Sequence, residues 1–168
     1  MVEGLRRIAS YELHGAVSDS LDEVSLRQIL DDLRIVIEAD WSEIDGAVRW
    51  HLPPAMPAVL GERQGLFQAF LNLAQNSRRA VESCAVRELS VAVSVDDRAV
   101  HVRFRDTGPG ISEPDRLFQP FQEGADGAGL GLYVSRAVVR SYGGDLCWEP
   151  HTGGTCFRVD VPVAGSAP

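Results

Sequence analysis

The chain has 168 residues, of which 45% are hydrophobic and 24% charged, so it can bury one hydrophobic core but is too short for two ordinary domains. Its formal net charge of −8, with arginines scattered along the chain, excludes a surface that follows nucleic-acid phosphates, and we expect no nucleic-acid partner. All 16 basic residues are arginine, which excludes a phosphate-binding loop ending in Gly-Lys and any catalytic lysine.

Cysteine usage and hydropathy indicate the compartment. The sequence has three cysteines, Cys84, Cys147 and Cys156, whose spacing does not suit a metal site and whose odd number does not suit a disulfide framework. This usage indicates a reducing cytosol. No apolar run approaches the roughly 20 residues that span a bilayer, and the N-terminus has no signal-peptide core. We therefore expect a cytoplasmic domain without direct membrane contact.

Hydrophobic periodicity predicts mainly helices in the first half of the chain. Loosely spaced apolar residues predict a short amphipathic helix within residues 1–20, and tighter three- and four-residue spacing predicts a helix over 25–39. Alternation then predicts a strand over 48–52, which two prolines close. The longest helical pattern runs over residues 62–84.

Strand patterns prevail in the second half. Alternating residues predict a hairpin of two strands over 89–95 and 100–104, and two closing strands over 146–149 and 156–161. Between them, helical spacing predicts one further helix over 130–141. A Gly- and Pro-rich loop region separates the hairpin from the helix. This order predicts an α+β fold, in which helices pack on one face of a mostly antiparallel or mixed sheet.

The first of four candidate functional clusters lies inside the long helical pattern. Asn72 and Asn76 are four residues apart, which places both amides on one helix face within an apolar stripe. Hydrogen bonds to a neighbouring loop would explain such a pair in isolation. Alternatively, one amide oxygen binds a hard cation such as Mg²⁺, and Arg79 reaches the same anion.

The second and third clusters lie in the loop region. The second is Asp106-Thr-Gly-Pro-Gly-Ile111, at the end of a predicted strand. Its glycines permit a tight turn and the close approach of a flat ligand, and its carboxylate can accept a hydrogen bond from an exocyclic amine; an ordinary turn is the competing interpretation. The third, residues 117–121, has two aromatic residues around a proline and alone indicates only a loop anchor.

The fourth cluster, Gly127-Ala-Gly-Leu-Gly-Leu132, opens a predicted helix. Free backbone N–H groups and the positive end of the helix dipole therefore face whatever precedes it, which favours an anion such as phosphate. The cluster does not fit the dinucleotide-binding fingerprint, because its glycines fall at every second position.

Together and in this order, the four clusters closely resemble the N, G1, F and G2 boxes of the histidine-kinase branch of the ATPase superfamily that includes gyrase, Hsp90 and MutL. The resemblance covers roughly residues 21–163, and Gly153-Gly-Thr155 resembles the family's last nucleotide-side motif. It implies the catalytic ATP-binding domain of a bacterial sensor histidine kinase. The implied fold is a two-layer α/β sandwich, the Bergerat fold, with a mixed sheet of about five strands and three helices on one face.

The resemblance also implies domain boundaries. Residues 1–20 would be a helical appendage, the end of a dimerisation helix; residues 21–164 would form the ATP-binding catalytic domain, and residues 165–168 a flexible tail. The family's phosphoacceptor is a histidine followed by an acidic residue. That context surrounds none of the four histidines in the sequence, which are His14, His51, His101 and His151. We therefore expect the chain to bind ATP without phosphorylating itself.

By position, the resemblance implies a role for each motif residue. Asn76 would bind the Mg²⁺ that bridges the phosphates, Asn72 would line the same site one turn earlier, and Arg79 would contact phosphate; these are the expected catalytic residues. Asp106 would accept the adenine amino hydrogen. The other residues expected to contact ATP are Gly108, Gly110, Ile111, Phe118, Gly127, Gly129, Leu130, Gly131, Leu132 and Thr155.

A mobile lid is expected over residues 122–128, with the glycines of the fourth cluster at its hinge. The family commonly carries a lysine or arginine there, whereas this lid offers only acidic charge. One phosphate contact is therefore missing, or Arg78 or Arg79 supplies it.

The implied reaction transfers the γ-phosphoryl group from Mg-ATP to a histidine on a separate dimerisation domain, and from there to the receiver domain of a response regulator. Asn72 stands where the superfamily's hydrolases usually carry a glutamate base, and an amide cannot take a proton, so transfer is favoured over hydrolysis. Two alternatives stay open. One is a non-catalytic ATP-binding regulatory module of the same fold; the other is an aspartic protease built on Asp106-Thr-Gly108, which Arg105 and Pro109 do not suit.

Overall fold

The computed structural model describes residues 21–121 and 130–165. In these residues the chain forms three α-helices, seven β-strands and one short 3₁₀ helix. Their order is β1 (Asp22–Val24), α2 (Leu26–Ser42), β2 (Ala47–His51), β3 (Val59–Gly61), α3 (Arg63–Val81), β4 (Glu88–Val95), β5 (Ala99–Asp106), η1 (Pro114–Arg116), α4 (Gly131–Ser141), β6 (Asp145–Glu149) and β7 (Cys156–Pro162). The appendage predicted at 1–20, the lid predicted at 122–128 and residues 166–168 of the predicted tail lie outside the described residues.

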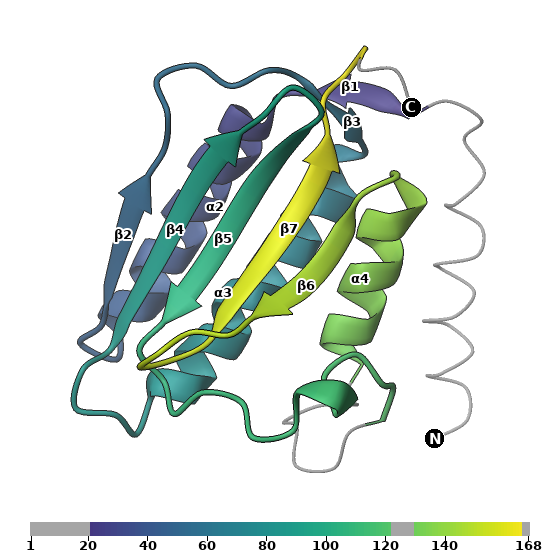
Figure 1. The fold of residues 1–168 in the computed structure, drawn as a ribbon. Helices are drawn as coiled ribbons and strands as arrows, with labels where there is room; N and C mark the ends of the chain where they lie inside the picture. Colours follow the sequence, from purple (N-terminus) through teal and green to yellow (C-terminus); the bar gives the residue numbers. More distant parts are fainter. Residues whose placement is uncertain (1–20, 122–129, 166–168) are drawn as a thin grey trace, which may run out of the picture.

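The strands form a mixed five-stranded sheet and a separate two-stranded sheet. The order in the large sheet is β2-β4-β5-β7-β6, in which β2 runs parallel to β4 and all other neighbours are antiparallel. β1 and β3 form the small antiparallel sheet. Figure 1 shows α2, α3 and α4 together behind one face of the large sheet. The predicted α+β sandwich, with a mixed sheet of five strands and three helices on one face, is confirmed.

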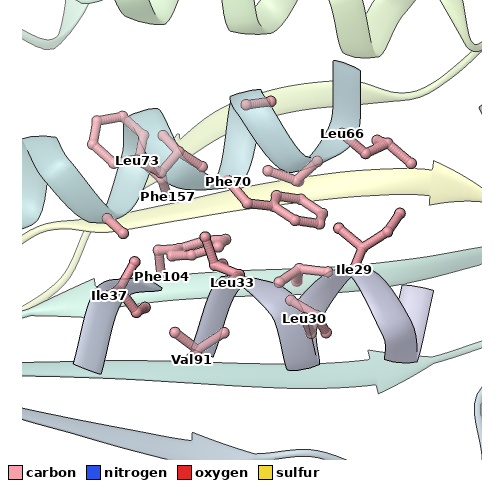
Figure 2. Close-up of a cluster of buried hydrophobic side chains, with 14 of the residues drawn as sticks. Ile29, Leu30, Leu33, Ile37, Leu66, Phe70, Leu73, Val91, Phe104 and Phe157 are labelled. Atoms are coloured by element: carbon pink, nitrogen blue, oxygen red, sulfur yellow. The ribbon is translucent and has the colours of Figure 1, made fainter. Parts of the chain in front are cut away.

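The hydrophobic core lies between the helices and the sheet. Apolar side chains alternate along each strand and recur every three or four residues along each helix, so both layers turn an apolar face inward. Val102 and Phe104 of β5 are fully buried, and Phe70 of α3 packs on Phe104 with ring centroids 5.6 Å apart. Figure 2 shows side chains from α2 and α3 meeting Val91, Phe104 and Phe157 of the sheet. Each such buried side chain stabilises the fold by about 1.5–3 kcal/mol.

The helices begin in different ways. Ser25 caps α2, because its hydroxyl accepts a hydrogen bond from the backbone N–H of Gln28 at 3.4 Å. Leu130 precedes α4 and makes no side-chain cap, so the first N–H groups of α4 are left without this partner. None of the described helices is long and apolar enough to cross a bilayer.

Several segments meet at one end of the large sheet. β5 ends there at Asp106, and the turn between β6 and β7 lies beside it, at the lower end of Figure 1. The start of α4 lies at the same end. Gly108 sits against the last turns of α3, since a Cβ atom added to it would lie 3.1 Å from the Cβ of Ala80. The fold thus gathers the predicted motifs at one end of the molecule.

Candidate functional site

Asp106, the one carboxylate among the predicted site residues, is buried, with 3% of its surface exposed. Its Oδ1 accepts hydrogen bonds from the backbone N–H groups of Gly108, at 2.9 Å, and Thr155, at 3.2 Å. Its own backbone N–H donates to the carbonyl of Thr155 at 2.9 Å. The carboxylate is therefore fixed between the turn after β5 and the start of β7, and it keeps lone pairs for a further donor.

Opposing effects act on the charge of this carboxylate. Burial raises the pKa of Asp106. Backbone hydrogen bonds from Gly108 and Thr155, together with the nearby Ser77 hydroxyl and His151, favour the charged form without cancelling the effect of burial. The result is a buried acceptor whose pKa lies above its ordinary value. Such a group gains most from a ligand that donates a hydrogen bond to it.

Two glycines allow the backbone to close around Asp106. A Cβ atom on Gly154 would lie 1.8 Å from the carbonyl oxygen of Asp106, so no larger residue fits the observed turn. Gly110 has a φ of 83°, a left-handed conformation that favours glycine. The glycines of the second cluster and of the β6–β7 turn thus have a steric role beside the carboxylate.

The two asparagines of α3 have different partners. Asn76 is half-buried, and its Oδ1 accepts a hydrogen bond from the guanidinium of Arg79. Asn72 instead donates from Nδ2 to the hydroxyl of Ser135 on α4, at 3.1 Å. The predicted pair on one helix face is present, but only Asn76 lies in contact with Arg79.

Arg78 is held away from this cluster. Its guanidinium Nε donates to the backbone carbonyl of Asp40 at 3.2 Å, and the side chain forms ion pairs with Asp40 and Glu43 at the end of α2. Of the two arginines that could replace a lid cation, Arg79 is the one beside Asn76.

Phe118 anchors the loop that follows the second cluster. Its ring packs edge-on against Phe157, with centroids 6.4 Å apart, and the guanidinium of Arg136 lies over it at 4.3 Å. Arg136 is in turn paired with Asp145 at 3.0 Å. The sequence alone indicates only a loop anchor for the third cluster. In the structure, the Phe118 ring also contacts both the sheet, at Phe157, and α4, at Arg136.

The remaining predicted residues occupy the same end of the sheet where they are described. Thr155 is buried, Gly131 is the first residue of α4, and Ile111, Leu130 and Leu132 are half-buried. Gly127 and Gly129 lie outside the described residues. The sequence pattern did not reveal Ser77, which lies near Asp106, or Ser135 and Arg136, which contact Asn72 and Phe118. Each lies on a different element from the residue that it approaches, so no local pattern could reveal it.

The donor set suits a magnesium ion that brings most of its own ligands. Asn76 offers a hard oxygen, but the described part of the chain has no cluster of three or more His, Cys, Asp or Glu side chains that could hold a metal by itself. Mg²⁺ often keeps waters and binds substrate phosphates beside one or two protein oxygens. The residues present therefore fit a metal that arrives with an anionic ligand.

Comparison with known proteins agrees with this geometry. A family profile described as histidine kinase-, DNA gyrase B-, and HSP90-like ATPase matches residues 61–165. The C4-dicarboxylate transport sensor protein DctB of Rhizobium meliloti (strain 1021) is 29% identical over 96% of this chain and 28% of its own length. The chain thus spans less than a third of that curated relative.

Solved structures give the same fold. Full-length ShkA in complex with AMPPNP matches with a TM-score of 0.76 and 27% identity, over 89% of this chain and 32% of ShkA. The histidine kinase ThkA, in complex with the response regulator protein TrrA, matches with a TM-score of 0.75 and 20% identity, over 97% of this chain and 48% of that chain. A further curated relative is the sensor histidine kinase TmoS of Ectopseudomonas mendocina, 28% identical over 86% of this chain and 16% of its own length. The profile match spans more than half of the sequence, and the chain therefore belongs to the histidine kinase-, DNA gyrase B-, and HSP90-like ATPase family.

Proposed function

We propose that this chain binds Mg-ATP and donates its γ-phosphoryl group to a histidine on the dimerisation domain of a two-component sensor kinase. The observation that carries the proposal is the buried Asp106 carboxylate, held by the backbone of Gly108 and Thr155 with lone pairs to spare. A fixed carboxylate of this kind can accept a hydrogen from the adenine amino group. AMPPNP bound to ShkA, a relative of the same fold, supports an adenine nucleotide as the ligand.

The other site residues divide into a base end and a phosphate end. Gly110 and Ile111 border the base beside Asp106, Phe118 supports that loop, and Thr155 assists through water. At the phosphate end, Asn76 would hold Mg²⁺ and Arg79 would contact phosphate. Leu130, Gly131 and Leu132 at the start of α4 would assist, as would Gly127 and Gly129, which precede them in the sequence. Arg79 now donates to the Asn76 oxygen that the metal would take, so metal binding would release this arginine toward the phosphates.

Phosphoryl transfer, rather than hydrolysis, follows from the chemistry of position 72. The amide of Asn72 cannot accept a proton from water, and its Nδ2 already donates to Ser135. A histidine imidazole needs no such base, because it is already nucleophilic. Positioning and charge neutralisation then account for most of the catalysis, as is usual for phosphoryl transfer.

The partners follow from the same proposal. The phosphoryl group would pass from the histidine to the receiver domain of a response regulator, and ThkA, which shares this fold, was solved with such a regulator. The domain boundaries proposed are 1–20, 21–164 and 165–168. Three free cysteines are in line with a cytoplasmic domain.

Calorimetric titration with ATP, with and without Mg²⁺, tests the site. We expect magnesium-dependent binding by the wild-type chain, and loss of binding in Asn76→Ala and Asp106→Ala. Gln75→Ala is the matched control, because Gln75 is an exposed neighbour on α3 and should leave affinity unchanged. A folded wild-type chain that bound no ATP would contradict the proposal.

A second candidate is a non-catalytic ATP-binding module of the same fold. The observation that favours it is the lid sequence over residues 122–128, which carries acidic residues and no lysine or arginine. Such a module would bind ATP as above but would transfer no phosphoryl group to any histidine-bearing domain.

A further inference from the structure

The side-chain amide of Asn72, on α3, contacts both Gly131 and Ser135 in the first turn of α4. Nδ2 of Asn72 donates to the Ser135 hydroxyl at 3.1 Å, and Ser135 is buried, with 6% of its surface exposed. Oδ1 of Asn72 lies against Gly131, since a Cβ atom added there would be 2.5 Å from this oxygen. Gly131 and Ser135 are four residues apart and therefore neighbours on one face of α4.

This contact joins two elements that carry opposite sides of the phosphate end. Asn72 lies one helical turn before Asn76 on α3, so its position is fixed relative to the proposed metal ligand. Gly131 is the first residue of α4, whose N-terminal N–H groups have no side-chain cap at Leu130. The Asn72–Ser135 hydrogen bond thus connects the helix that presents these N–H groups to the helix that carries Asn76.

We propose that Ser135 is a positioning residue for the phosphates of the bound nucleotide, acting through Asn72. The inference rests on the proposed function, because it assigns Ser135 to the phosphate end of that same site. Without the hydroxyl, Nδ2 of the half-buried Asn72 loses its acceptor, and the first turn of α4 loses this hydrogen bond to α3. At the base end, Asp106 accepts its hydrogen bonds from Gly108 and Thr155 instead, so recognition of the base should be unaffected.

The test compares ligands that differ only in phosphates. Calorimetry with ATP, ADP and adenosine, all with Mg²⁺, is run on the wild-type chain and on Ser135→Ala, Ser135→Thr and Ser141→Ala. Ser141 is the matched control, because it lies on the same helix and its hydroxyl donates to the Val138 carbonyl of that helix, at 2.6 Å. Thermal melting of each variant establishes that it is folded, and Ser135→Cys, nearly the same size with a weak acceptor, replaces Ser135→Ala if that variant unfolds.

We expect Ser135→Ala to weaken ATP and ADP roughly three- to tenfold, the loss of one hydrogen bond, and to leave adenosine affinity unchanged. Ser135→Thr, which keeps the hydroxyl, should restore ATP and ADP affinity, and Ser141→Ala should match the wild type. If the wild-type chain binds the nucleotides normally but Ser135→Ala weakens the affinity for all three ligands equally, or for none of them, the inference about Ser135 is overturned and the proposed function stands. A folded wild-type chain that bound none of the nucleotides would overturn the proposed function and this inference with it.

Discussion

At the residue scale, Asp106 is an ionisable carboxyl group in a deeply buried position. Burial raises its pKa, and the backbone donors at Gly108 and Thr155 offset only part of that effect. A carboxyl group whose pKa is raised by folding stabilises the fold below its unfolded pKa, and this contribution is lost as pH rises through the folded pKa. Above the folded pKa, ionising this side chain therefore costs stability, which a ligand donating a hydrogen bond to it would return.

Replacing Asp106 by Asn separates these two roles. The amide oxygen can still accept from Gly108 and Thr155, but the charge is gone and an NH₂ group faces the adenine amine. We expect ATP affinity to fall about tenfold or more, as for the loss of a hydrogen bond to a charged group, while the free energy of unfolding at pH 7 stays equal or rises.

Urea unfolding and calorimetry measure the two quantities on the same protein. Asp115→Asn is the control, because Asp115 is exposed on η1 and should change neither. A variant that lost both stability and binding would show that the carboxylate is needed to hold the turn, not to recognise the base.

At the scale of elements, the sequence predicts regular structure where apolar residues repeat and fails where they do not. The helix predicted over 62–84 is present as α3, which ends three residues earlier, and the hairpin at 89–104 is present as β4 and β5. β1 and β3 were not predicted, since three-residue strands are too short to show alternation. Their pairing depends on a contact between distant segments.

The same limit applies to the candidate site. Asp106 and the glycines beside it form a local motif, so their neighbourhood follows from the sequence. Ser135 carries no such signal, because it reads as one small polar residue in a helix and its partner is 63 residues away. Arg136 is similar, since only the fold places its guanidinium over Phe118.

The turn between β6 and β7 offers a prediction at this scale. Gly153 and Gly154 both have positive φ, so alanine strains the backbone at either position, by roughly 1–3 kcal/mol. A Cβ atom on Gly153 would meet nothing within 4 Å, whereas one on Gly154 would collide with the Asp106 carbonyl at 1.8 Å. Comparing Gly153→Ala with Gly154→Ala therefore separates the effect of the collision with Asp106 from the effect of backbone strain.

We expect Gly154→Ala to lower the free energy of unfolding by at least about 2 kcal/mol more than Gly153→Ala, because the turn must move away from β5. ATP binding should be lost in Gly154→Ala, since Thr155 would move away from Asp106, and largely kept in Gly153→Ala. Equal losses in the two variants, by urea unfolding and calorimetry, would show that backbone strain, not the contact with β5, governs this turn.

At the scale of the whole molecule, the site is built from segments that the sheet brings to one end, in a chain whose net charge is −8. Such a chain repels an anion unless a metal and a few arginines neutralise it locally. Among the described histidines, His101 is held by Asp96 and Asp160 through both ring nitrogens, and His51 and His151 lack a following acidic residue. The acceptor is therefore expected on another domain.

Incubation with γ-labelled ATP tests this expectation. The chain alone should acquire no phosphohistidine, whereas addition of a histidine-bearing dimerisation domain from a related sensor kinase should produce label on that domain that is labile to acid and stable to alkali. Asn76→Ala should abolish the label by removing the metal ligand, and a His→Gln acceptor domain should stay unlabelled. Because Asn72 cannot serve as a base, free phosphate should remain near background in the wild-type chain. ATP binding without labelled acceptor would favour the non-catalytic module, since the acidic lid would then leave the γ-phosphate without a cation at the moment of transfer.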